Sequence, residues 1–113
     1  MRRNLLFVTF LAIAALSGPV ATPALADDEL VVIVIKGGKF VPSEVTVPTG
    51  KKIKITVRNQ DTKAAEFESS DLHREKVVQP GAEVTMFVGP LDAGSYEFFD
   101  DFHLENRGHL IAK

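Results

Sequence analysis

Apolar and polar residues alternate with a period of two along much of the chain. Residues 53–58 place Ile53, Ile55 and Val57 on one side and polar side chains on the other, and residues 83–89 repeat the pattern. A period of two predicts strands with one buried face. Further strands are expected in four segments, residues 29–36, 44–47, 95–99 and 109–112.

Turn-forming residues separate these segments. Residues 48–50, 80–81 and 92–94 contain Pro, Gly or Asp in combinations that favour tight turns. Residues 29–36 are almost continuously apolar, which is typical of a strand buried on both faces, and residues 69–78 have room for one helical turn. About seven short strands divided in this way predict an all-β fold, a Greek-key β-sandwich.

The first 26 residues have the composition of a secretory signal peptide. A basic start at Arg2 and Arg3 precedes an apolar run, and small residues lead up to Ala26. The apolar run stops before Gly18, short of the roughly 20 residues of a membrane span, which makes a retained anchor the weaker alternative. We expect export, cleavage after Ala26 and a single domain over residues 27–113.

Charge and cysteine content exclude several classes of function. The chain has 15 acidic and 13 basic residues. Two of the basic residues lie in the expected signal peptide, so the exported domain is acidic and offers no basic patch to nucleic acid. Cysteine is absent, so neither disulfides nor thiolate metal ligands are available. No nucleophile stands in a motif with a histidine, which makes a hydrolase the least favoured class.

The segment YEFFDDFH, residues 96–103, concentrates chemically active side chains. Asp100 and Asp101 follow two phenylalanines, and His103 comes three residues after Asp100. Adjacent aspartates are common in solvated turns, and a single histidine is often a surface residue. Carboxylate and imidazole groups are also metal ligands, so the segment is a candidate metal loop.

The order of motifs resembles a cupredoxin domain. Residues 39–61, KFVPSEVTVPTGKKIKITVRNQD, are similar to the first half of that family. Residues 77–113, with PGAEV, then GSYEFFDDFH and a final GHLIA, are similar to the second half. The resemblance covers nearly the whole expected domain, and it implies a β-sandwich with a metal loop after the GSYEFF strand.

Three of the four places that carry blue-copper ligands in cupredoxins hold other residues here. Asp100 stands at the place of the cysteine, Glu66 at that of the upstream histidine and Asn106 near that of the axial methionine. His103 keeps the family's residue. A copper–thiolate electron carrier is therefore excluded. The resemblance implies that Glu66, Asp100 and His103 meet at one end of the sandwich as a site with two carboxylates and one imidazole.

We expect Asp101 to join this metal site, and Glu68 and Glu105 to complete or orient it. Hard carboxylate oxygens favour the more highly charged ion of a redox pair, Fe(III) over Fe(II) and Cu(II) over Cu(I). The substituted pattern is similar to the cysteine-poor cupredoxin-like domains of bacterial iron uptake, both the EfeO-type domain and the small stand-alone protein of ferrous-iron transport operons. This branch implies a bound iron or copper ion and a periplasmic location.

The resemblance also implies a function. The protein would assist iron uptake by binding or oxidising Fe(II) and by delivering Fe(III) to an inner-membrane iron permease or a companion periplasmic iron-binding protein. The alternative is a metal-free interaction module that keeps only the sandwich. A copper chaperone is less favoured, because only Met86 remains after signal cleavage and soft ligands are what hold Cu(I).

Overall fold

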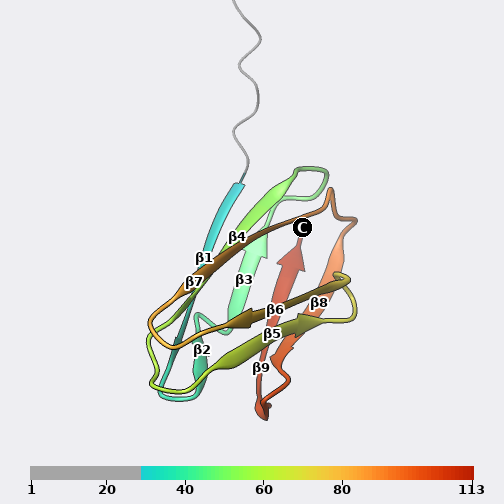
Figure 1. The fold of residues 1–113 in the computed structure, drawn as a ribbon. Helices are drawn as coiled ribbons and strands as arrows, with labels where there is room; N and C mark the ends of the chain where they lie inside the picture. The colour runs from blue at the N-terminus through green and yellow to red at the C-terminus, as the bar shows by residue number, and fades with distance from the viewer. Residues whose placement is uncertain (1–28) are drawn as a thin grey trace, which may run out of the picture.

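The structure, a computed structural model, describes residues 29–113. The expected signal peptide, residues 1–26, lies outside the described residues. Within the described part, nine strands form two packed sheets (Figure 1). The four-stranded sheet has the order β2 (Lys39–Val41), β1 (Glu29–Lys36), β4 (Ile53–Asn59), β7 (Glu83–Val88). The five-stranded sheet has the order β3 (Glu44–Val47), β9 (His103–Ala112), β8 (Gly94–Asp100), β5 (Ala65–Ser69), β6 (Arg74–Val78).

The expected all-β sandwich is confirmed, with more strands than the seven predicted. Two of the strand pairs are parallel, β1 with β4 and β3 with β9, and the others are antiparallel. In the same part of the chain no helix is long and apolar enough to cross a membrane.

The core lies between the sheets and follows the two-residue period. In β4, Ile53, Ile55 and Val57 are at most 1% exposed, as the alternation predicts. The aromatic centre of the core is formed by Phe67 stacked on Phe98 at 5.2 Å between ring centroids, with Phe40 packed edge-on against both. These rings fix the inner faces of β5 and β8, from which the candidate site is built.

Two expectations about local structure were wrong. Strand β1 is buried on one face rather than two, because Val31, Ile33 and Ile35 point into the core while Val32 and Val34 stay half-buried. Residues 69–78 hold no helical turn: a turn over residues 70–73 leads directly into β6.

The loop between β4 and β5 is held at the end of the sandwich where β8 ends. The Asn59 side-chain amide donates to the carbonyl oxygens of Lys63 (2.7 Å) and Val78 (3.0 Å). Asp61 accepts hydrogen bonds from the Gly37 and Gly38 N–H groups at 2.7 and 2.8 Å, in a β1–β2 turn where both glycines have positive φ. These hydrogen bonds connect the β4–β5 loop to the β1–β2 turn and to the end of β6, and the loop and the turn both line one pocket.

Candidate metal centre

Asp100 and His103 are in direct contact where β8 turns into β9. The ladder between these strands is irregular at Phe99 and Asp100, and beyond this point Asp100 pairs with His103. The Asp100 Oδ2 atom lies 2.9 Å from His103 Nδ1. A bulge of this kind re-aims side chains at a sheet end. Here it turns both groups to the same side.

The Asp100 carboxylate is buried and held by backbone groups. The residue is 1% exposed. Its Oδ1 atom accepts hydrogen bonds from the N–H groups of Glu66 and Phe102, both at 3.0 Å. Burying a carboxylate is tolerated when hydrogen bonds compensate for the lost hydration. The position is thus fixed before any ligand arrives.

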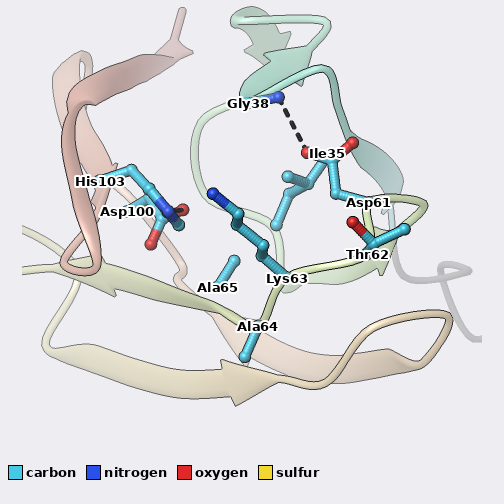
Figure 2. Close-up of a pocket in the computed structure, with 9 residues that line it drawn as sticks. All are labelled: Ile35, Gly38, Asp61, Thr62, Lys63, Ala64, Ala65, Asp100 and His103. Carbon is cyan, nitrogen blue, oxygen red and sulfur yellow. Dashed lines mark hydrogen bonds and ion pairs between the residues drawn. The ribbon is translucent and has the colours of Figure 1, made fainter.

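A pocket of about 280 Å³ opens beside this pair. It is lined by Ile35, Gly38, Asp61, Thr62, Lys63, Ala64, Ala65, Asp100 and His103. Figure 2 shows the Lys63 side chain extending into the space between the Asp100–His103 pair and Asp61. The Gly38 and Gly37 N–H groups keep the pKa of the Asp61 carboxyl below its usual value. Both Asp61 carboxylate oxygens are therefore used in holding the β1–β2 turn.

The Asp100–His103 pair supplies two donor atoms that are close enough together to bind one ion once the imidazole turns away from its hydrogen bond. Metal–oxygen and metal–nitrogen bonds of about 2.0–2.2 Å would place an ion so that atoms 2.9 Å apart subtend an angle of roughly 90°. The ion would replace the proton shared between Nδ1 and Oδ2. Among residues 29–113, the pocket offers these two well-placed donors and no third, and the Lys63 ammonium opposes a cation. Water would therefore supply the remaining ligands.

The structure does not bring the Glu66 carboxylate to Asp100 and His103. Phe67 lies opposite Asp100 in the β5–β8 pairing, and both side chains point inward. Glu66, one residue earlier, therefore points to the outer face of the sheet. Glu66 contacts Asp100 through its backbone N–H. The residue of β5 that lines the pocket is Ala65, which carries no donor.

Glu66 joins an acidic group on the outer face instead. Carboxylate oxygens of Glu66, Glu68 and Asp101 all lie within 4.8 Å of one another. A hydrogen bond with the Glu75 carboxyl, burial, and the charges of Glu75, Asp101 and Glu68 raise the pKa of Glu66 to about 7. Burial, followed by Asp101 and Glu75, also raises the pKa of Glu68. Five of the six expected ligands are thus divided between two faces, with Asp100 and His103 at the pocket and Glu66, Glu68 and Asp101 outside.

The remaining positions of interest lie on β9. Glu105 is exposed and belongs to neither group. The Asn106 side chain accepts the Phe40 N–H at 2.9 Å and so ties β9 to β2. Its Nδ2 atom has no partner within residues 29–113. Asn106 therefore serves the fold through its oxygen.

Sequence reasoning missed the contribution of three residues. Ala65 and Lys63 line the pocket, and Glu75 approaches Glu66 from β6. The alternation of AEFES around the apolar Phe67 was a usable signal for the orientation of Ala65 and Glu66. Glu75 had no such signal, because its neighbours depend on the register between β5 and β6.

The two packed sheets and their strand order are the architecture of a cupredoxin-type domain. The cupredoxin-like domain model matches residues 5–112, and this chain belongs to that family.

Solved structures of similar fold include an amicyanin and a purple cupredoxin. Amicyanin from Paracoccus versutus has a TM-score of 0.60 at 21% identity, with 78% of this chain and 83% of that chain covered. A purple cupredoxin from Nitrosopumilus maritimus has a TM-score of 0.58 at 18% identity, covering 73% and 98%. At these identities the likeness establishes the fold.

A curated relative is much closer in sequence. The uncharacterized protein RP394 of Rickettsia prowazekii (strain Madrid E) is 46% identical over 81 residues, which is 71% of this chain. The match spans 65% of the length of that relative.

Proposed function

We propose that this protein is a periplasmic metal-binding cupredoxin-like protein that assists bacterial iron uptake. Its pocket would hold one iron or copper ion between Asp100 Oδ2 and His103 Nδ1. The observation that carries the proposal is the 2.9 Å contact of these two atoms, on a buried carboxylate, at the end of β8. The secretory character of residues 1–26 supports the location.

The donor set supports iron or Cu(II) over Cu(I). One carboxylate oxygen, one imidazole nitrogen and water are borderline-to-hard ligands. An amicyanin variant of the same fold has been solved in a reduced Cu(I) form, whereas this chain has no thiolate for a Cu(I) site. A site that favours the more highly charged ion suits the binding or oxidation of Fe(II) and the delivery of Fe(III) to an inner-membrane permease or a periplasmic partner.

A titration with Cu(II), followed by electron paramagnetic resonance, tests the pocket. We expect one bound Cu(II) with hyperfine coupling to a single imidazole nitrogen. His103→Ala should remove the coupling, and His109→Ala, which changes an exposed histidine on the outer face of β9, should leave it intact. An unchanged spectrum in the His103 variant would exclude the pocket as the site.

The alternative is a metal-free interaction module, and one observation favours it. Phe102 and Leu104, on either side of His103, are 50% and 54% exposed. A partner could cover these side chains while Asp100 and His103 keep each other's hydrogen bond. Equilibrium dialysis against Fe(III), Cu(II) and Zn(II) separates the two functions. If none of these ions binds, the metal-binding function is excluded and the interaction module is supported.

A further inference from the structure

Four carboxylates converge on the outer face of the five-stranded sheet. Glu68 on β5 lies directly opposite Glu75 on β6, and Glu66 is the next residue of β5 on the same face. Asp101 comes from the β8–β9 turn and donates its N–H to the Glu66 carbonyl oxygen at 3.0 Å. Like charges placed directly opposite each other weaken a strand pair. The arrangement therefore calls for a compensating positive charge.

No basic side chain in residues 29–113 supplies that charge. Arg74 and Lys76 flank Glu75 in sequence, but strand alternation places both on the other face of β6. Arg74 is also occupied, because its guanidinium donates to the carbonyl oxygen of Phe87 at 2.7 and 3.0 Å. None of the four carboxylates takes part in an ion pair within this part of the chain.

Glu66 is the second, independent indication of a ligand. It is 7% exposed, so more than nine-tenths of it is buried, and its carboxylate points into the group of acids. Across residues 29–113 it receives no hydrogen bond from an N–H group, lysine, arginine or histidine. Its close neighbour is another carboxyl, Glu75, which can donate to it only while one of the two carries a proton. A carboxylate on a residue this buried, with another carboxyl group as its partner, is costly to the fold unless a proton or a cation lies between the two groups.

We propose that Glu66, Glu68, Glu75 and Asp101 form a second cation site, separate from the Asp100–His103 pocket and specific for hard divalent or trivalent ions. All of its donors are carboxylate oxygens, which favour Mn(II) and iron over Cu(I) or other soft ions. This assignment rests on the proposed function: if the protein serves iron uptake, this second site holds iron as cargo and the pocket holds copper, the other of the two ions named for it.

The two sites share backbone but no ligand. The Glu66 N–H binds the Asp100 carboxylate, and the Asp101 N–H binds the Glu66 carbonyl oxygen. Their side chains leave the sheet on opposite faces. Variants can therefore remove one site while the other persists, and the failure of either proposal can be distinguished from the failure of the other.

The test is a titration of the full chain with Mn(II), in which loss of the free-ion paramagnetic resonance signal reports binding. We expect one Mn(II) per chain. Glu68→Gln and Glu75→Gln, each isosteric and on the outer face, should each weaken binding about tenfold or more. Glu44→Gln on β3 and His103→Ala in the pocket should change the affinity less than about twofold.

Competition identifies the preferred ion. Anaerobic Fe(II) should displace Mn(II) at lower concentration than Ca(II) does. Wild-type affinity in both Gln variants, or loss of Mn(II) binding in His103→Ala, would overturn the second site. Displacement by Ca(II) ahead of Fe(II) would overturn its assignment to iron.

Discussion

The carboxylate of Asp100 and the imidazole of His103 lie 2.9 Å apart, and the same carboxylate accepts two backbone N–H groups. One side chain therefore both offers a metal ligand and closes the turn between β8 and β9. Its two roles can be separated by choosing substitutions that preserve one of them.

Asp100→Ala should destabilise the fold, because it leaves the buried N–H group of Glu66 and the partly buried N–H group of Phe102 without their acceptor. The expected loss in the free energy of unfolding is about 2–4 kcal/mol. Asp100→Asn keeps an acceptor oxygen for both groups and should cost less than about 1 kcal/mol. Urea denaturation measures both. Equal losses in the two variants would contradict the role of the Asp100 side chain as acceptor for these two N–H groups.

Ala65→His should create a third metal donor in the pocket. Ala65 lines the pocket beside Asp100 and His103, so a new imidazole there would face them. Cu(II) affinity should rise about tenfold or more, with coupling to two nitrogens. The control is Glu66→His, whose side chain leaves on the other face and should add no nitrogen to the pocket ion. Two-nitrogen coupling in the control would contradict the observed register.

Lys63→Met should strengthen cation binding in the pocket. The ammonium group reaches into the space beside the Asp100–His103 pair (Figure 2). Removing a unit positive charge from the lining of a partly hydrated pocket should favour cation binding by about 1 kcal/mol, roughly fivefold in Kd. Lys76→Met on β6 is the matched control. Competition with a chelator gives both constants, and weaker binding in the Lys63 variant would refute the repulsion.

Without metal, stability should fall as pH rises from about 4.5 to 7. The pKa of Glu66 is raised to about 7 in the fold, so the folded chain binds more protons than the unfolded chain in this window. The stabilising contribution of Glu66 is complete below its pKa in the unfolded chain, about 4.5, and is lost as the pH rises through its pKa in the folded chain, about 7. Glu75→Gln gives the Glu66 carboxylate an amide donor and should flatten the decline. Melting temperatures between pH 4.5 and 7.5 provide the test; an equal slope in both proteins would count against it.

Gly108→Ala should be strongly destabilising. A Cβ atom there would lie 2.5 Å from the Ser43 carbonyl oxygen and would also overlap the Phe98 ring. Overpacking of this kind costs about 1–3 kcal/mol, and the rigid backbone partner favours the upper end. Gly94→Ala, whose nearest atom is 3.8 Å away, should change the free energy of unfolding by less than about 0.5 kcal/mol. Similar melting temperatures for the two variants would contradict this packing.

Alternation in the sequence was sufficient for the sandwich, and the resemblance to cupredoxins was sufficient to expect Asp100 and His103 at one site, although their contact depends on the irregular ladder at Phe99 and Asp100. It was not sufficient for the partners of Glu66. A shift of one residue along β5 exchanges the inner and outer faces, and the resemblance to cupredoxins aligned the histidine place with Glu66 where Ala65 lines the pocket. Glu75 approaches Glu66 through the β5–β6 register, which no local pattern specifies.

Strand β9 is the last strand of the chain, yet it lies inside its sheet, between β3 and β8 (Figure 1). Strand β3 pairs with β9, where Glu44 lies opposite His109. Strand β3 therefore gains its neighbour in the sheet only when β9 is present. A nascent chain therefore keeps an open sheet edge at β3 until β9 has been synthesised. Removing the last few residues of β9 should impair folding far more than their small number suggests.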